Sequence, residues 1–447
     1  MRHLLVICIF LLASCSSDEP ADGMPMDDTP CGVMDAIGFS VVPQDESVLL
    51  QWGAVGHFDG PFRSCSPEAF EVYEVADDGQ SQLLAEIEGS AGTFLVEGLE
   101  NGDIHSFKVI ALHNELESVQ SAVRTVRVGL IPLPQISDFP LALPQYSFEL
   151  FFLAPDGDRF LYRNGSDDWY VSSFSNPATV TKVVDDSFLA RWNPHQDNEV
   201  IYREKQYIQI ASNTNGVTSK SMTAVNIDDG SKEVLHEISD YMDFGTEHKP
   251  EQYWIHSFAY SADGQSIYFE SNKDNGSTTL TEKKVYNNIW RLDRDTKVIE
   301  PLSDFLPIEF EMKTSVEDPK SPGNFYVLGG IAGEVVEIPD AVFNPEKVDV
   351  YYYNTADQSL TLVLETIYEE EFLDINPAGD QLLIVNSASG REEIWSYNLA
   401  TQDLRQVTQS VQYRYTKHQY YPNWISDTEF MVSVYFDSEP KLAVFKI

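Results

Sequence analysis

A degenerate repeat in the second part of the chain limits its possible folds more than any other feature. Each copy joins a turn rich in Pro, Asp, Asn and Gly to a short, strongly apolar segment. Runs of this kind that are bounded by turn residues are typical of buried β-strands. The apolar segments are RFLYRN from Arg159, EVIYRE from Glu199, SIYFES from Ser266, NFYVLG from Asn324, QLLIVN from Gln381 and EFMVSV from Glu429.

Further strands flank each apolar segment. An apolar or aromatic strand precedes it, as in AYSADGQ and INPAGDQ, and a third strand follows, as in NIWRLDR and EIWSYNL. A more polar fourth strand comes next in five of the six copies, as in KVIEPLS and LRQVTQ. Four strands repeated every 40 to 65 residues, roughly, predict an all-β fold, a six-bladed β-propeller of four-stranded antiparallel blades over residues 131–447.

The sixth copy ends in its third strand at Ile447, so its outer strand has to come from elsewhere. An open ring would expose an unpaired strand edge. We therefore expect a strand around residues 139–143, before the first blade, to complete the sixth blade and close the ring. The prolines of FPLALP favour an outermost position in that blade, because Pro is confined to edge strands.

The segment before the repeats has a different pattern. Residues 31–130 contain seven short stretches of alternating apolar and polar residues, among them SVLLQW, FEVYEV and HSFKVIAL. Seven such strands in about 100 residues predict an antiparallel β-sandwich. The segment resembles a fibronectin type III domain in the position of Trp52 and in the run LVEGLENGDIHSFKVIAL, although His105 stands where that family usually has Tyr. The resemblance implies a spacer or adhesion module.

The repeats themselves resemble the TolB-type propeller repeat. The best matches are APDGDRFLY, SADGQSIYF, NIWRLDR and EIWSYNL, and the resemblance covers about 300 residues, six copies being in register. It does not extend to the N-terminal domain of TolB, which is of a different type. Some TolB-like propellers are lyases that use His and a metal ion in the central channel, so the resemblance leaves a catalytic channel open.

The first residues carry a targeting signal. MRHLLVICIFLLASC, residues 1–15, has a basic start, an apolar stretch and a small-residue end, which is typical of a secretion signal. Leu12, Ala13, Ser14 and Cys15 resemble the lipobox of bacterial lipoproteins, which implies lipidation of Cys15 and attachment to a membrane. Residues 16–30 are acidic and contain Pro, as expected of a flexible tether. Because Ser16 replaces the Asp that retains some lipoproteins in the inner membrane, we expect an outer-membrane location.

The remaining cysteines predict a disulfide. With Cys8 removed with the signal and Cys15 lipidated, Cys31 and Cys65 are left as a pair. In an oxidising compartment they would close a loop of roughly 35 residues, worth about 3 to 4 kcal/mol on the chain-entropy account. A metal site is the less favoured alternative, because two thiols without nearby His make a poor zinc site.

Charge and motifs exclude several functions. The chain has 29 Lys and Arg against 71 Asp and Glu, a net charge of −42, so it repels nucleic acid. It contains no Gly-x-Ser-x-Gly, His-Glu-x-x-His, phosphate-loop or Gly-x-Gly-x-x-Gly motif. We expect no cofactor and no bound metal, and we expect a monomer.

Long connections gather on one face of the predicted ring, where the second-to-third and fourth-to-first loops open, and such loops are often functional. The loop before the sixth blade supplies aromatic rings and cations suited to a glycan, a peptide or an acidic group. An alternative is that Tyr420 and Tyr421 only begin an inner strand, and that a lone His256 is structural. The candidate ligand-binding residues are Tyr413, Arg414, Tyr415, Lys417, His418, Tyr420, Tyr421, Trp254 and His256.

Two functions follow from these observations. The module order and the missing catalytic motifs favour a non-catalytic binding or scaffold lipoprotein that presents its loop-rich face to a protein or glycan. The alternative is a polysaccharide lyase or hydrolase with a metal or His site in the channel. It requires convergence of residues such as His195, His248, His256 and His418.

Overall fold

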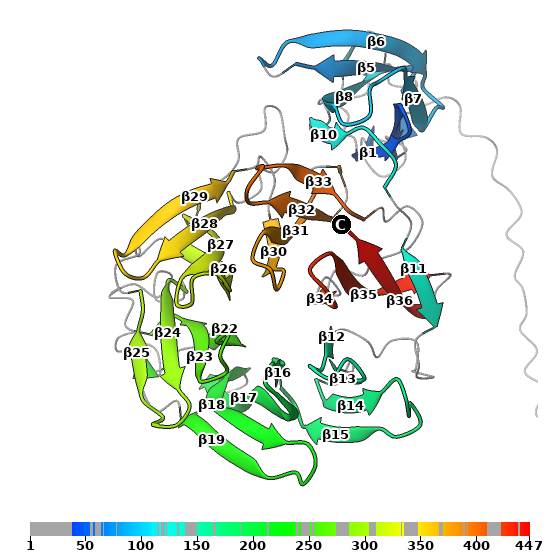
Figure 1. Ribbon diagram of the computed structural model, residues 1–447. Helices are drawn as coiled ribbons and strands as arrows, with labels where there is room; N and C mark the ends of the chain where they lie inside the picture. The colour runs from blue at the N-terminus through cyan, green and yellow to red at the C-terminus, as the bar shows by residue number, and fades with distance from the viewer. Residues whose placement is uncertain are drawn as a thin grey trace, which may run out of the picture.

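The computed structural model describes most of the chain, and every regular element among the described residues is a β-strand (Figure 1). The described residues are 38–53, 57–58, 64–65, 67–76, 78–113, 116–117, 121, 123–131, 134–138, 150–163, 167–187, 189–211, 214–237, 241–242, 251–252, 255–273, 286–303, 310–331, 333–334, 347–365, 370–387, 389–390, 392–408, 422–436 and 439–447. Within these ranges no helix is long and apolar enough to cross a membrane.

Six four-stranded antiparallel sheets stand around a ring, with their first strands at the centre (Figure 1). In order of pairing, three of them are β12 (Leu150–Leu153), β13 (Arg159–Arg163), β14 (Trp169–Ser173), β15 (Thr181–Val184); β16 (Ala190–Asn193), β17 (Gln196–Ala211), β18 (Thr214–Asn226), β19 (Lys232–Glu237); and β22 (Ile255–Tyr260), β23 (Ser266–Ser271), β24 (Asn288–Asp293), β25 (Ile299–Pro301). The others are β26 (Phe310–Glu317), β27 (Phe325–Ile331), β28 (Asp349–Asn354), β29 (Ser359–Leu364); β30 (Glu370–Ile375), β31 (Gln381–Asn386), β32 (Glu393–Asn398), β33 (Leu404–Gln406); and β34 (Asn423–Trp424), β35 (Glu429–Phe436), β36 (Glu439–Lys446), β11 (Gln135–Asp138). The predicted all-β fold with four-stranded antiparallel sheets is confirmed.

The repeat's apolar segments are the second strands of these sheets. In β23 and β31 every residue but the first is buried, because neighbouring sheets cover both faces. A strand covered on both sides reads as a continuous apolar run. In the outer strands β15 and β29 half of the residues are exposed and only Val184 is buried, as expected of strands at the edge of a sheet.

The turn that begins each repeat is stabilised by interactions among its own residues. In the Pro-Asp-Gly turn at residues 155–157, Oδ1 of Asp156 accepts hydrogen bonds from the backbone N–H groups of Asp158 at 2.8 Å and Arg159 at 2.9 Å. Gly157 has φ of 72°, a left-handed conformation that costs Gly little. The turn therefore delivers the chain straight into β13.

The hydrophobic core of the ring lies between the sheets. Separate clusters of buried apolar side chains join each sheet to its neighbour around the circle. The cluster that completes the circle brings Phe151 and Phe160 of the β12–β15 sheet against Leu442 of β36. Side-chain packing, and not only strand pairing, thus closes the ring.

The closing strand is present but lies earlier in the chain than predicted. β11 pairs with β36, with Gln135 opposite Val444 and Asp138 opposite Lys441. The prediction that residues 139–143 supply this strand is wrong in position: the strand ends at Asp138, immediately before the proline-containing FPLALP. Pro has no N–H to donate to a strand ladder, so the stretch before it is the better pairing partner.

Two antiparallel sheets precede the ring. One contains β1 (Phe39–Gln44), β2 (Ser47–Trp52) and β7 (Thr93–Glu97); the other contains β10 (Arg124–Arg127), β8 (Ile104–His113), β5 (Ala69–Val75) and β6 (Ser81–Glu88), with β9 (Leu116–Glu117) beside β8. They enclose one core in which the Trp52 and Phe70 rings lie 5.3 Å apart. His105 pairs through Nδ1 with Glu74 at 2.7 Å. The side chain of Cys65, in β4 (Ser64–Cys65), and all of Cys15 and Cys31 lie outside the described residues, so the lipidation and the disulfide stay predictions.

These two sheets contact the ring along the β30–β33 sheet (Figure 1). The backbone N–H of Val41 donates to the carbonyl of Ser389 at 2.7 Å, and Nη1 of Arg124 donates to the carbonyl of Ser387 at 2.9 Å. Strand β10 also lies against β33. The N-terminal sheets are therefore seated on the ring by specific polar contacts.

Candidate ligand-binding channel

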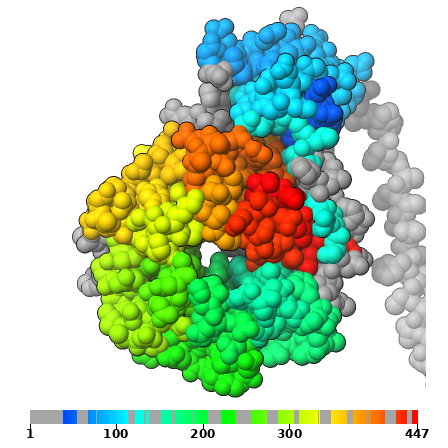
Figure 2. All heavy atoms as spheres, viewed as in Figure 1, coloured from blue at the N-terminus to red at the C-terminus, as the bar shows by residue number. Residues whose placement is uncertain are grey.

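A channel of about 970 Å³ runs through the centre of the ring. Figure 2 shows the ring hollowed at this point. The lining extends from the beginnings of the inner strands, at Leu189 and Phe372, to the turns that follow them, at Pro155 and Pro194. Pockets of 300 to 1,000 Å³, roughly, hold small ligands in many proteins. The channel is therefore large enough for a ligand of several residues.

Bulges in the inner strands widen the set of side chains that reach the channel. Strand β22 shifts register between Ile255 and Phe258, and β26 shifts between Met312 and Thr314. A β-bulge places an extra residue on one strand and redirects its side chains. As a result, the consecutive residues Lys313, Thr314 and Ser315 all line the channel, as do His256 and Ser257.

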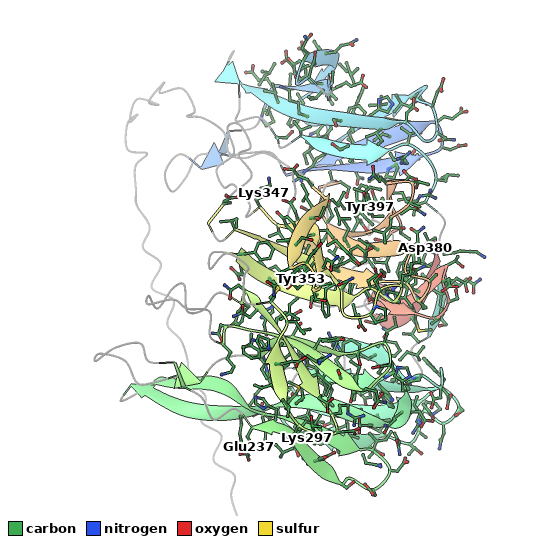
Figure 3. The ribbon with its side chains drawn as sticks, turned by 60° about the vertical axis from the view of Figure 1, so that its left-hand side comes forward. Glu237, Lys297, Lys347, Tyr353, Asp380 and Tyr397 are labelled. Atoms are coloured by element: carbon green, nitrogen blue, oxygen red, sulfur yellow. The ribbon has the colours of Figure 1, made fainter. Side chains whose placement is uncertain are left out.

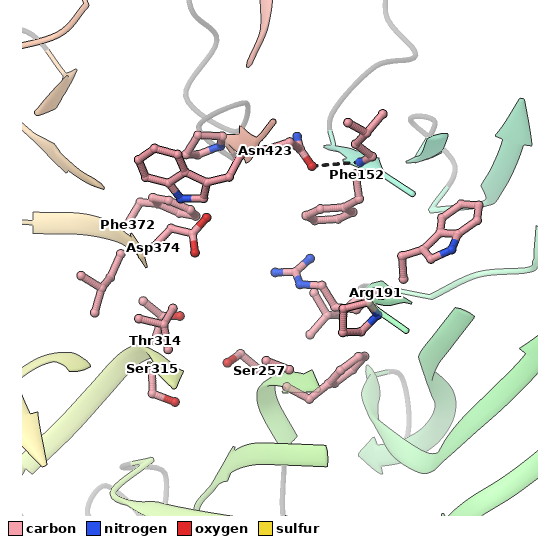
Figure 4. Close-up of a pocket in the computed structure, with 18 of the residues that line it drawn as sticks. Phe152, Arg191, Ser257, Thr314, Ser315, Phe372, Asp374 and Asn423 are labelled. Atoms are coloured by element: carbon pink, nitrogen blue, oxygen red, sulfur yellow. Dashed lines mark hydrogen bonds between the residues drawn. The ribbon is translucent and has the colours of Figure 1, made fainter. Parts of the chain in front are cut away.

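Two opposite charges face each other across the channel. Figure 4 shows Arg191 of β16 and Asp374 of β30 projecting into the channel from opposite walls. The guanidinium carbon of Arg191 lies 4.1 Å from the centre of the Phe152 ring, close enough for a cation–π interaction. Burial raises the pKa of Asp374 to about 7, although a hydrogen bond from Ile375 N–H and the charge of Arg191 oppose the rise. Asp374 therefore exchanges a proton near neutral pH.

A second carboxylate lies just behind the wall. Glu270 of β23 is 1% exposed, and the hydroxyls of Ser257 and Ser315 both donate hydrogen bonds to it. Burial raises the pKa of Glu270 to about 7, against the opposing effects of the Ser315 hydrogen bond and the charge of Arg191. Ser257 and Ser315 themselves line the channel (Figure 4). Glu270 thus accepts the hydroxyl protons of two channel residues.

Of the predicted ligand-binding residues, His256 is the one that the structure describes. Its Nε2 lies 3.1 Å from the carbonyl oxygen of Lys313, and its ring stacks on Tyr286 with centroids 4.6 Å apart. Burial, assisted by the charge of Arg203, lowers the pKa of His256 to about 4, so the ring is neutral at pH 7. The other predicted residues lie outside the described ranges: Trp254, Tyr413, Arg414, Tyr415, Lys417, His418, Tyr420 and Tyr421.

The part of the chain that is described contains no group of three or more His, Cys, Asp and Glu side chains placed to hold a metal ion. Of the histidines predicted for a channel site, His248 and His418 lie outside the described ranges, and His195 lies in the β16–β17 turn. Its Nε2 is 2.6 Å from the carbonyl oxygen of Ala262, in the turn of the next sheet. Its ring also packs against Gly264. His195 and His256 each contact backbone and do not converge on a common point.

The channel charges were missed by the sequence analysis. Arg191 and Asp374 stand in the apolar inner-strand segments FLARWNP and FLDINP, and Glu270 stands inside SIYFES. A charged residue within a strand that packing should bury is costly unless it has a partner or a function. That contrast was available in the sequence and is the signal that would have found them.

Three solved structures illustrate what the chain is similar to. A putative TolB from Agrobacterium tumefaciens has a TM-score of 0.41 at 12% identity, over 67% of this chain and 90% of that one. Oligogalacturonate lyase from Vibrio parahaemolyticus has a TM-score of 0.44 at 9% identity, over 93% of this chain and 98% of that one. A protein of unknown function from Bacteroides thetaiotaomicron has a TM-score of 0.45 at 10% identity, over 93% of this chain and 100% of that one. No protein-family model and no curated protein matches the chain, so the fold assignment rests on its own strand pairing.

Proposed function

We propose that this chain is a non-catalytic lipoprotein of the cell envelope, in which a six-bladed propeller presents its loop-rich face to a protein or glycan. In this proposal lipid on Cys15 holds it to a membrane, residues 16–30 form a tether, and a fibronectin type III-like domain follows. The two antiparallel sheets around a common core support that domain assignment. We propose an outer-membrane location, because Ser16 follows Cys15 in place of the Asp that retains some lipoproteins in the inner membrane.

The observation that carries the proposal is the β17–β18 hairpin. Its strands have 16 and 13 residues, whereas the equivalent β13 and β14 have 5 each. The extension emerges from the second-to-third strand connection and stands out from the ring (Figure 3). Because the extension projects beyond the ring (Figure 3), a docking role explains it better than a role in holding the sheets together.

The base of the hairpin is held in place. Nζ of Lys205, whose side chain is 4% exposed, lies 2.7 Å from both Oδ2 of Asp167 and Oδ1 of Asp186 in the neighbouring sheet. Lys205 is at the point where β17 and β18 shift register, between Glu204 and Lys205. Charge-assisted hydrogen bonds of this kind fix direction as well as contributing energy. The hairpin is thereby presented at a defined angle, as a docking element requires.

Affinity capture from envelope extracts tests the proposal. The bait is the chain from Ser16 to Ile447, beside a variant with Tyr413, Arg414, Tyr415 and His418 changed to Ala. A matched control carries Asp295→Ala and Val298→Ala in the exposed β24–β25 turn on the opposite face. The proposal expects a protein or glycan that the parent and the control retain and the loop variant loses. Equal retention by all three forms, or none by the parent, would contradict it.

A second candidate function, hydrolysis or elimination on a polysaccharide, is favoured by one observation. Asp374 lines the channel and has a pKa near 7, as a general acid or base requires. If the protein is an enzyme, Asp374→Asn should abolish release of new reducing ends or unsaturated products from acidic polysaccharides. The binding proposal instead expects no turnover by the parent, so measurable turnover lost in that variant would replace it.

A further inference from the structure

We propose that the channel binds a zwitterionic ligand, with the ligand's carboxylate on Arg191 and its ammonium group on a wall formed by Asp374, Ser257 and Ser315. This site lies on the inner strands and is separate from the docking face proposed above. It is formed by described residues alone, so its test does not depend on the loops of the docking face.

The channel lining includes hydrogen-bond donors that carry positive charge. They are Arg191 of β16, Arg203 of β17 and Lys313 of β26. Arg203 is 5% exposed and donates to the carbonyl of Ile255, so it belongs to the wall. Arg191 projects toward the centre, stacked on Phe152 (Figure 4). A guanidinium has five N–H donors and no acceptor, in a planar fork that matches a carboxylate.

The wall formed by Asp374, Ser257 and Ser315 offers hydrogen-bond acceptors. Ser257 and Ser315 each have one hydroxyl proton, and each donates it to Glu270. What these hydroxyls can offer to the channel while Glu270 is ionised is therefore their lone pairs. Asp374 adds carboxylate oxygens from β30. An ammonium group, with three donors and a positive charge, complements this acceptor wall.

The charge balance favours the same ligand. The protein has a net charge of −42, so an anion without a cationic group meets general repulsion on approach. A zwitterion meets less repulsion, and its two charges complement Arg191 and Asp374, which face each other across the channel (Figure 4). Among the described residues that line the channel, the charged or titratable groups besides Asp374 are Arg191 from β16, Arg203 from β17, His256 from β22 and Lys313 from β26. The charge of Arg191 acts on both Asp374 and Glu270.

Binding should also release protons. Burial holds the pKa values of Asp374 and Glu270 near 7, so both are partly protonated at neutral pH. A bound ammonium stabilises the ionised forms and lowers these pKa values. Protons therefore leave the protein when the ligand binds, and the heat of binding near pH 7 should depend on the buffer.

Three small peptides separate the two charges of the ligand. Triglycine carries both an ammonium and a carboxylate, N-acetyl-triglycine lacks the ammonium, and triglycine amide lacks the carboxylate. Isothermal titration of the chain from Ser16 to Ile447 should show saturable binding of triglycine. Each blocked peptide should bind at least tenfold more weakly, on the order of the loss of one charged hydrogen-bonded contact.

Single variants assign each charge to its wall. In Arg191→Gln, triglycine and its amide should bind equally, and in Asp374→Asn, triglycine and its N-acetyl form should bind equally. Arg405→Gln, on outer strand β33, is the matched control and should keep the preferences of the parent. The comparison of the three peptides on the parent protein stands even if a variant fails to fold. No saturable binding of triglycine, or equal binding of all three peptides, overturns the proposal.

Discussion

At the scale of single residues, the channel wall is unusual because it keeps two carboxylates where burial opposes their charge. Glu270 is buried between two sheets, and hydroxyls from both sheets stabilise it by donating hydrogen bonds: Ser257 from its own sheet and Ser315 from the next. Each donated bond offsets part of the cost of burying the carboxylate. Protonation relieves the remainder, which is why its pKa lies near 7.

The raised pKa of Glu270 allows a prediction of how the stability of the protein depends on pH. Its pKa is about 7 in the folded protein, against an ordinary value of 4.5. Between these values the folded state binds more protons than the unfolded state, so its contribution to stability is fully present below pH 4.5 and is lost as the pH rises through 7. Glu270→Gln removes this pH-dependent loss of stability. As the pH rises, the free energy of unfolding of the parent should therefore fall relative to that of the variant, by up to about 1.4 kcal/mol for each pH unit.

Urea unfolding from pH 5 to pH 8 measures this difference. Glu300→Gln, at a half-exposed position of β25, is the control for the same chemical change. Its free energy of unfolding should run parallel to that of the parent at every pH. If Glu270→Gln also runs parallel to the parent, the buried carboxylate does not titrate as we infer.

At the scale of elements, the β17–β18 hairpin depends on an ion cluster at its base. Lys205 holds two aspartates, Asp167 and Asp186, both of which have left-handed backbone conformations, with φ of 59° and 46°. Such conformations are uncommon for residues other than Gly. The lysine therefore fixes two turns of one sheet as well as the hairpin of the next.

Removing that lysine should loosen the hairpin without unfolding the ring. Lys205→Met leaves two aspartates without their buried partner, and we expect a loss of about 1 to 3 kcal/mol in the free energy of unfolding. Hydrogen exchange should become faster in residues 205–219. The control is Lys220→Met, because Lys220 pairs with Glu204 at 2.9 Å but is 55% exposed, and should cost under about 1 kcal/mol. Unchanged exchange in Lys205→Met would show that the cluster does not hold the hairpin.

The sequence predicted these elements unevenly. The second strands were predicted closely, for example SIYFES for β23, because burial on both faces leaves a continuous apolar run. The closing strand was predicted too late in the chain, because QISD, which forms β11, is short and polar and lacks an apolar strand pattern. Apolar periodicity does not predict the channel charges, because a single charged residue such as Asp374 interrupts the pattern without contradicting it. Their convergence depends on ring closure, which brings β16 and β30 to opposite walls.

At the scale of the whole molecule, the N-terminal sheets and the ring form a fitted contact. Gly390 has φ of 85°, and a Cβ there would lie 2.0 Å from the carbonyl oxygen of Phe39. Arg127 of β10 pairs with Asp403, which also accepts a hydrogen bond from Arg405 at 2.8 Å. The closeness of the two backbones leaves no room for a side chain. The N-terminal domain is therefore a fixed extension of the ring and not a loosely joined spacer.

Gly390→Ala should separate the two parts. The new methyl group clashes with backbone of the N-terminal sheets, in addition to the strain of about 1 to 2 kcal/mol that any Ala has in this conformation. Gly230→Ala is the matched control, since Gly230 has φ of 72° and open space around its Cβ position. Small-angle scattering should show a larger radius of gyration for Gly390→Ala than for the control. Equal dimensions would mean that the contact tolerates the methyl group.

If the ring presents a docking face, shortening the β17–β18 hairpin should remove part of it. Lys205 and Ser219 are cross-strand partners, so residues 206–218 can be replaced by Asn-Gly, which forms a two-residue hairpin turn. The measurement is the amount of each envelope protein or glycan retained by this variant and by the parent in the same capture. We expect the amount of the component specific to the parent to fall at least tenfold. Retention of that component at the parent's level would contradict the assignment of the hairpin as part of the docking face.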